Sequence, residues 1–328
     1  MAPLQHGGGM KRIDREPARD GAAQSRRDAA DLGYTVAGQT VHAPPLAPGL
    51  YIVATPIGNL GDITLRALEV LAAADLVACE DTRVTRKLLD RYGIAVPLSP
   101  YHDHNAAIAR PKLLARLDAG QAVALVSDAG TPLVSDPGYK LVRAARQGGH
   151  TVSPIPGSSA VLAALAVAGI ATDRFFFEGF LPAKQQARRA RIAELARIPA
   201  TLVVFEAGPR IAATLADLAE ELGDRDAALC RELTKLHEEV RRDGLTTLAR
   251  DYASAPPPRG EIVMVIAPPP PQAQPQQGDI DALLRAALGN ASLKDAVAEV
   301  ATVTGHSRRD VYRRALALTK GPNDDTPD

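Results

Sequence analysis

The sequence has few cysteines, no excess of either charge and no long hydrophobic run. Cys79 and Cys230 form neither a disulfide framework nor a CxxC metal motif, so we expect a reducing, cytoplasmic environment. Lys and Arg total 38, as do Asp and Glu, so any nucleic-acid surface must come from local charge asymmetry. No signal peptide is recognised, and the apolar run at 160–170 is too short to cross a bilayer. We therefore expect a globular protein of about two domains with no membrane partner.

Phosphate-binding motifs are also missing. The first predicted strand, 50–55, runs into ATPIGNLGDIT, where Gly58 and Gly61 allow close backbone approach and Asp62 or Thr64 can cap the next helix. This loop matches neither the GxGxxG fingerprint nor a Walker loop, which needs Gly-Lys-Ser or Gly-Lys-Thr. A nucleotide-dependent α/β enzyme is therefore disfavoured.

Short β-branched runs alternate with amphipathic segments over residues 49–172. This alternation predicts an α/β domain built on a mostly parallel sheet that is covered by helices. Gly93, Gly120 and Gly148 are expected to end three of those helices. Residues 1–48 show no apolar periodicity, so we expect them to be a disordered leader.

A second α/β domain is predicted at 173–267, where strands alternate with longer excursions. We expect strands at 175–182, 201–207, 227–233 and 261–267, a basic helix at 184–197 and another helix at 209–223. A Pro-rich linker follows at 268–278, then a helical module at 279–320 and a tail at 321–328. Asp or Ser precedes each helix of the module as a plausible N-cap. The module resembles half of a helix-turn-helix, which could contact RNA or serve as a plain helical domain.

Acidic side chains follow the second predicted strand in the segment CEDTR, 79–83. Ligands of open α/β sheets bind beyond the carboxyl ends of the strands. Glu80 and Asp81 beside Arg83 would suit a site that handles a hydroxyl or a ribose, although Asp81 could equally be a helix N-cap. The segment YHDHN, 101–105, carries two histidines, but no third ligand stands at helical spacing, so we expect no metal.

The loop LVSDAGTPLVSDPG, 125–138, repeats Ser-Asp and follows each repeat with Gly and Pro. Gly130 and Gly138 tolerate positive φ, whereas the prolines remove donors and stiffen the chain. A phosphate cradle would need bare N–H groups and a lysine, but this loop offers carboxylates and carbonyls. It is better suited to a neutral or cationic ligand such as S-adenosylmethionine, over which the loop IPGSSA, 155–160, could close.

These blocks, together with FFFEGFLPAK, RELTKLHEE and GEIVMVI in this order, resemble the ribosomal RNA small subunit methyltransferase I family of the tetrapyrrole methylase superfamily. The resemblance covers about 50–267 and extends weakly into the C-terminal helices. It implies two α/β domains with the cofactor in the cleft between them, a homodimer, and S-adenosylmethionine as the methyl donor. It also implies 2'-O-methylation of a decoding-region cytidine, cytidine 1402 by convention, in 16S rRNA on the assembled small (30S) subunit.

The resemblance also implies roles for residues at matching positions. Cofactor contacts are expected at Pro56, Asp128, Ala129, Gly130, Thr131, Pro132, Ser135, Gly157, Ser158, Phe205 and Glu206. The RNA nucleotide is expected to face Glu80, Asp81, Arg83, His102, Asn105, Arg231, Glu232 and Lys235. Two departures stand out. VFEAGPR, 204–210, replaces a Tyr-Glu-Ser-Pro-His-Arg run that is common in relatives, and Ser158 stands where Pro is frequent.

Methyl transfer to a 2'-hydroxyl depends on alignment and on a base that receives the proton. We expect Glu80 or Asp81 to take or orient that proton. Lys235 and Arg83 would grip phosphates or lower the hydroxyl pKa, although Lys235 could also be an ordinary exposed lysine at a strand end. The basic helix, with Lys184, Arg188 and Arg189, and the C-terminal helices are the expected RNA footprint.

Two other functions remain open from the sequence. A precorrin or other corrinoid methylase would share the fold and cofactor, but a small acidic macrocycle has no need of an extended basic surface. A non-catalytic ribosome-assembly factor would keep the RNA-binding surface but would have no methyltransferase activity. The loops described above are intact at every strand end, which disfavours this function.

Overall fold

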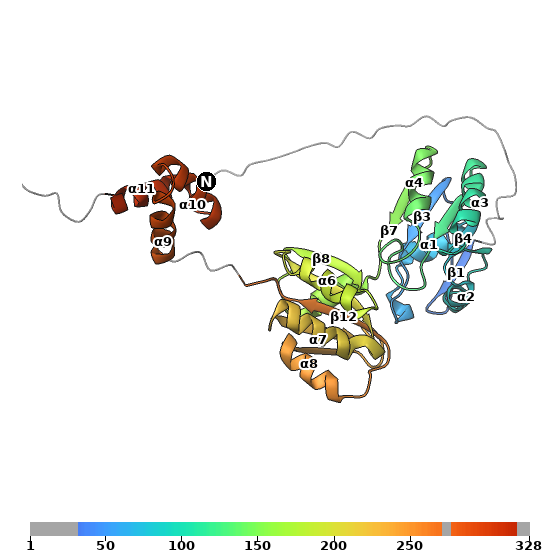
Figure 1. Ribbon diagram of the computed structural model, residues 1–328. Coiled ribbons are helices and arrows are strands. Elements are labelled where there is room, and N and C mark those ends of the chain that lie inside the picture. Colours follow the sequence, from blue (N-terminus) through green and yellow to red (C-terminus); the bar gives the residue numbers. More distant parts are fainter. Residues whose placement is uncertain (1–31, 271–276, 320–328) are drawn as a thin grey trace, which may run out of the picture.

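The computed structural model describes residues 32–270 and 277–319, which form two α/β domains and a C-terminal helical module (Figure 1). The first 31 residues of the expected leader, part of the expected linker and the expected tail lie outside the described residues. Within the described ranges, no helix has both the length and the apolar character that crossing a membrane requires.

The N-terminal domain is built on a five-stranded, all-parallel sheet of order β5-β4-β6-β3-β7. Its strands are β3 (Gly49–Val53), β4 (Leu76–Cys79), β5 (Leu98–Pro100), β6 (Ala122–Leu125) and β7 (Val152–Ile155). Its helices are α1 (Leu65–Ala73), α2 (Thr82–Arg91), α3 (Ala106–Asp118), α4 (Tyr139–Gln147) and α5 (Ala160–Ala168). The central strands β4 and β6 are buried along their whole length, as expected where helices cover both faces. The predicted parallel sheet is confirmed.

A β-hairpin precedes this sheet and corrects one expectation. Strands β1 (Gly33–Val36) and β2 (Gln39–His42) pair antiparallel around Ala37 and Gly38, both of which have positive φ, as a tight hairpin turn requires. Tyr34 is buried in the core beside α1 and α2. The prediction of disorder up to residue 48 is therefore wrong for the hairpin, because tertiary contacts hold a segment too short to show periodicity.

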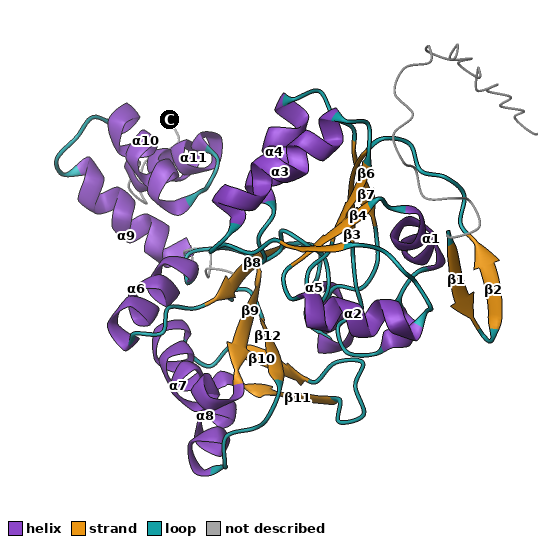
Figure 2. Cartoon of the chain, turned by 90° about the vertical axis from the view of Figure 1, so that its right-hand side faces the viewer, coloured by secondary structure: helices purple, strands orange, loops and turns teal. Residues whose placement is uncertain are grey.

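The second domain contains a mixed five-stranded sheet of order β11-β10-β12-β9-β8. Its strands are β8 (Phe175–Phe180), β9 (Thr201–Ala207), β10 (Asp226–Arg231), β11 (Glu239–Gly244) and β12 (Glu261–Ile266). Helices α6 (Gln185–Leu195), α7 (Ile211–Leu222) and α8 (Leu245–Ser254) pack on one face, and α5 packs on the other (Figure 2). The sequence did not indicate β11, because this edge strand, EVRRDG, is mostly charged.

The helical module consists of α9 (Gln277–Leu288), α10 (Leu293–Thr304) and α11 (Arg308–Thr319) around a small core of its own. Ser292 caps α10 by accepting a hydrogen bond from the Asp295 N–H, and Ser307 accepts one from the Asp310 N–H. The expected serine caps are therefore confirmed at these two helices.

Candidate active site

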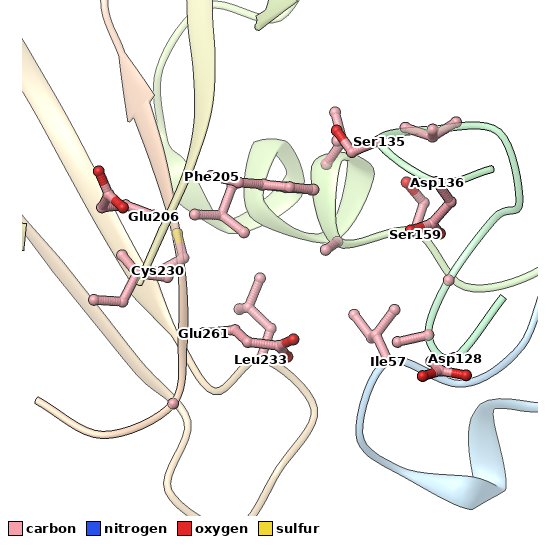
Figure 3. Close-up of a pocket in the computed structure, with 18 of the residues that line it drawn as sticks. Ile57, Asp128, Ser135, Asp136, Ser159, Phe205, Glu206, Cys230, Leu233 and Glu261 are labelled. Carbon is pink, nitrogen blue, oxygen red and sulfur yellow. The ribbon is translucent and has the colours of Figure 1, made fainter. Parts of the chain in front are cut away.

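A cavity of about 380 Å³ lies between the two α/β domains and is lined by residues of both (Figure 3). The N-terminal domain contributes the loops after β3, β4 and β6 and the start of α5, as expected for the carboxyl edge of a parallel sheet. The second domain contributes the ends of β8, β9 and β10 and the start of β12. Figure 3 shows Ile57 and Asp128 facing Leu233 and Glu261 across this space.

The loop after β6 is held in an unusual backbone conformation. Gly130 and Gly138 have positive φ, and so do Leu133 (76°) and Ser135 (62°), which lack the freedom of glycine. The end of β3 fixes this loop, because Thr55 and Gly130 exchange both backbone hydrogen bonds, at 2.9 and 3.0 Å. Strained residues held in this way are often found where a ligand binds.

Three carboxylates of the N-terminal domain, Glu80, Asp128 and Asp136, line one side of the cavity. Burial and then the charges of Asp128 and Asp136 raise the pKa of Glu80 above its ordinary value. Burial likewise raises the pKa of Asp136. Asp128 also joins two loops, since its Oδ1 accepts a hydrogen bond from the Asp81 N–H at 3.0 Å. This side of the cavity therefore favours a bound cation.

Asp81, next to Glu80, has a different environment. It caps α2 by accepting a hydrogen bond from the Arg83 N–H at 2.8 Å, and it forms an ion pair with the Arg83 guanidinium at 2.6 Å. Hydrogen bonding to Arg83 lowers the pKa of Asp81 to about 2. Of the two roles that the sequence allowed for Asp81, the structure therefore shows the helix N-cap. A carboxylate of such low basicity is also a poor proton acceptor. Neither Asp81 nor Arg83 lines the cavity.

Lys235 reaches the cavity from the turn between β10 and β11. Its Nζ donates to Glu232 Oε1 at 2.8 Å and to Glu261 Oε2 at 3.3 Å. Burial opposes the charge of Lys235, but these hydrogen bonds outweigh it and raise its pKa. The Lys235 stem crosses Gly58 so closely that a Cβ on Gly58 would lie 2.4 Å from Lys235 Cγ. Lys235 is therefore a fixed cation at the cleft, held against the N-terminal domain.

At the end of β9, Phe205 and Glu206 line the cavity and have different functions. Phe205 contacts the rings of Phe177 and Phe180 edge-on, with centroids 4.9 and 5.6 Å away. Glu206 is only 1% exposed, and its carboxylate accepts from the Ala207 N–H and the Thr214 hydroxyl at 2.8 and 2.6 Å. Phe205 offers an apolar surface to a ligand, whereas Glu206 chiefly fixes the backbone.

The cavity lining includes most of the expected cofactor contacts but not all of them. Asp128, Ala129, Gly130, Thr131, Ser135, Phe205 and Glu206 line it. Pro56, Pro132, Gly157 and Ser158 do not, and Pro56 borders a neighbouring space beside α2. The Ser158 carbonyl supports the site from behind, because it accepts a hydrogen bond from Thr131 Oγ1 at 3.3 Å.

Among the expected RNA contacts, Glu232 lines the cavity with Lys235 and Glu80. Asn105 instead closes a turn, since its side chain accepts from the His102 N–H at 2.9 Å and donates to the Pro100 carbonyl at 3.0 Å. Arg231 forms an ion pair with Glu239 at 3.0 Å. His102, Asn105 and Arg231 thus lie outside the cavity lining.

The basic helix α6 corrects another expectation. Arg188 is 4% exposed, and its Nε donates to Asp217 of α7 at 2.7 Å. Arg189 pairs with Glu221 at 2.8 Å and also with Glu220. The prediction that Arg188 contacts RNA is therefore wrong, because this guanidinium joins two helices in the interior. Lys184, which precedes α6, is exposed.

Several lining residues were missed from the sequence. They are Ile57, Val134, Asp136, Ser159, Ala160, Val161, Phe180, Ala207, Cys230, Leu233, Gly260, Glu261, Ile262 and Val263. Half of them stand next to residues that were expected, so the loops were identified better than the individual side chains. Cys230 gave no signal, because only the pairing of β10 with β12 brings it to the cavity. Among the described residues, no group of three or more His, Cys, Asp or Glu side chains could hold a metal ion.

Comparison with known proteins agrees with this geometry. Residues 49–249 match the family model described as Tetrapyrrole (Corrin/Porphyrin) Methylases, and residues 274–319 match the RsmI C-terminal HTH domain. The Ribosomal RNA small subunit methyltransferase I of Mesorhizobium japonicum is 53% identical over 291 residues, which cover 88% of this chain and 99% of that protein. The chain belongs to this methyltransferase family. Its fold class and its nature as a methyltransferase, both expected from the sequence, are thereby confirmed.

Further relatives support the same assignment. The Ribosomal RNA small subunit methyltransferase I of Erythrobacter litoralis is 52% identical over 276 residues, covering 84% of this chain and 97% of its own length. Among solved structures, diphthine synthase has a TM-score of 0.53 at 20% identity, covering 66% of this chain and 89% of that chain. The methyltransferase CobJ has a TM-score of 0.51 at 20% identity, covering 67% and 94%. These two structures share the fold.

Proposed function

We propose that this protein transfers a methyl group from S-adenosylmethionine to the 2'-hydroxyl of a decoding-region cytidine in 16S rRNA. The observation that carries the proposal is the carboxylate-lined cavity between two domains, in a chain 53% identical to a protein named for ribosomal RNA methylation. The choice of cytidine 1402 and of its ribose rests on the family resemblance. We further propose that the protein acts as a cytoplasmic homodimer on the assembled 30S subunit.

The lining residues fit S-adenosylmethionine, which supplies an electrophilic methyl group when bound. Asp128 and Asp136 would stabilise the sulfonium cation. Phe205 and the apolar side chains of Ile57 and Leu233 would cover the nucleoside. The strained loop after β6 would present backbone N–H and C=O groups for specific hydrogen bonds, as small-molecule sites commonly do.

Glu80 is the proposed proton acceptor. Its carboxylate lines the cavity and has a raised pKa, so it is more basic than an ordinary glutamate. Glu80 would accept the hydroxyl proton of the ribose, while bound S-adenosylmethionine would supply the methyl group. Alignment of the two reactants by both domains would supply much of the acceleration.

Lys235 and Glu232 are proposed to position the nucleotide. The ammonium of Lys235 lies at the cavity between Glu232 and Glu261 and could attract a phosphate beside the target ribose. Lys184 and the helices of the C-terminal module would extend this contact to more distant phosphates. Such contacts fix register without reading sequence, so binding should weaken steeply as salt increases.

Two alternatives are less well supported. A corrinoid methylase would use the same cavity, but it leaves residues 274–319, which match a helix-turn-helix domain, without a function. A non-catalytic assembly factor would not require a formed cavity with a carboxylate of raised pKa.

Mapping the methylated nucleotide tests the proposal. The protein is incubated with methyl-labelled S-adenosylmethionine and, in separate reactions, unmodified 30S subunits, free 16S rRNA or a corrinoid precursor, and the labelled position is then mapped. We expect label on one decoding-site cytidine ribose, with more on the 30S subunit. Label at another RNA position would assign a different target nucleotide. No label on RNA together with label on a corrinoid would favour the corrinoid methylase.

A further inference from the structure

The turn between β10 and β11, residues 232–238, lies beside the cavity. Glu232, Leu233 and Lys235 of this turn all line the cavity. The Lys235 stem packs over Gly58 of the other domain, so the turn spans the cleft. Lys235 thereby connects the two domains beside the cavity.

The turn holds a fixed and strained shape. Glu232 (φ 51°) and Thr234 (φ 67°) occupy the left-handed region, which is costly for residues other than glycine. Hydrogen bonds hold this shape: Glu232 N–H to Glu261 O at 3.1 Å, Lys235 N–H to Glu232 O at 3.0 Å, and Thr234 N–H to Glu238 Oε2 at 2.7 Å. The turn therefore presents its tip in one defined position.

Leu236 stands at this tip and is 93% exposed, although the residues before it line the cavity. A single exposed leucine is ordinary on a protein surface. This one is held by a strained turn beside the cavity, and its chain neighbours Lys235 and His237 are polar.

We propose that Leu236 is a positioning residue that inserts into the RNA stack and occupies the space left when the target nucleotide swings into the cavity. This inference rests on the proposed function. Apolar side chains are used in this way where proteins unstack bases, and extrusion of a nucleotide from a stack is costly. Leu236 would stabilise the extruded state, while Lys235, its neighbour, would hold the phosphate of the same nucleotide.

Kinetics of Leu236→Ala on unmodified 30S subunits test this inference. We expect kcat to fall by roughly tenfold to a hundredfold, because fewer bound complexes would hold the nucleotide extruded. KM, cofactor affinity and Tm should stay nearly unchanged, since the side chain makes little contact with the fold. Leu236→Met, which keeps a long apolar side chain, should recover most of the activity.

Leu65→Ala is the matched control, because Leu65 on α1 is 62% exposed and does not line the cavity. A second measurement uses an RNA fragment of the decoding region with a fluorescent cytidine analogue at the target. The unchanged protein should increase its fluorescence by unstacking, and Leu236→Ala should bind without this increase.

The two proposals fail in different ways. If the unchanged protein methylates no RNA, both are overturned. If it methylates the expected ribose and Leu236→Ala matches Leu65→Ala in kcat, only the role of Leu236 is overturned. A rise in KM with unchanged kcat would also overturn it, because a simple surface contact behaves in that way.

Discussion

Glu80 and Asp81 are neighbours in the chain with opposite electrostatic environments. Asp81 faces Arg83, and the pKa of its carboxyl is held at about 2. Glu80 faces the cavity, where burial and the nearby charges of Asp128 and Asp136 raise its pKa. One residue of difference in the loop thus separates a helix cap from the proposed proton acceptor.

Glu80→Gln is expected to lower kcat by about 10²- to 10⁴-fold, because a general base is lost. Cofactor affinity, measured by calorimetry, should change little if Glu80 acts on the hydroxyl. For the unchanged enzyme, kcat should fall as pH falls through the raised pKa of Glu80, because the protonated carboxyl cannot accept a proton.

The same substitution should raise thermal stability at neutral pH. A carboxyl whose pKa is raised by folding destabilises the folded state increasingly as the pH rises from its ordinary pKa through its raised pKa, and the amide removes this penalty. The gain in Tm should disappear below the ordinary pKa of glutamate, where both states are protonated. A loss of Tm at every pH would instead assign Glu80 a structural role.

Gly208 explains one departure from the pattern of relatives. A Cβ on Gly208 would lie 1.7 Å from the Pro258 carbonyl oxygen, so the backbone of the Pro-rich loop occupies the side-chain position. Gly208→Ala should therefore lower the free energy of unfolding by about 1–3 kcal/mol, measured by urea denaturation. Gly223→Ala is a useful comparison, because a Cβ there meets no atom and only its positive φ opposes the change. An unchanged free energy of unfolding in Gly208→Ala would show that the close approach costs nothing.

Helices α6 and α7 are joined by the buried ion pair of Arg188 and Asp217. Arg188→Ala would leave Asp217 charged and buried, at a cost of about 3–5 kcal/mol in the free energy of unfolding. Chemical denaturation should detect this loss even without RNA.

Lys184→Ala is the matched change on the exposed side of the same segment. It should leave stability unchanged and reduce the salt dependence of RNA binding, because one phosphate contact is lost. If Arg188→Ala were as stable as Lys184→Ala, the ion pair would contribute nothing to the packing of α6 on α7.

Elements differed in how well the sequence predicted them. The central strands of the N-terminal sheet, β4 and β6, were predicted because they are apolar runs buried on both faces. Strand β11 and the β1–β2 hairpin were not predicted, because their sequences carry no hydrophobic pattern. Pairing with neighbouring strands and a few tertiary contacts hold them in position. The C-terminal helices were predicted, with Ser292 marking the start of α10.

At the scale of the whole molecule, the helical module has its own core, formed by residues such as Leu284, Val300 and Val311. Removal of residues 271–328 should therefore leave the two α/β domains folded and cofactor binding unchanged. We expect KM for 30S subunits to rise about tenfold or more and the slope of log affinity against log salt to become shallower, because phosphate contacts are lost.

Filter binding across salt concentrations measures this slope for the full and shortened chains. Circular dichroism of the shortened chain provides the folding control. An unchanged KM and slope would show that the helical module is not part of the RNA-binding surface. That surface would then consist of Lys184 and the residues around the cavity.

The sequence by itself determined the α/β class, the loops that carry the site and the family, because hydrophobic periodicity and ordered motifs are local properties. Only the tertiary structure decided that Glu80 lines the cavity while Asp81 caps α2, and that Arg188 is interior. It also brought Cys230, Gly260 and Lys235 to one cleft. Burial and pairing depend on residues distant in the chain, so a pattern of neighbours cannot reveal which charged groups meet solvent and which meet each other.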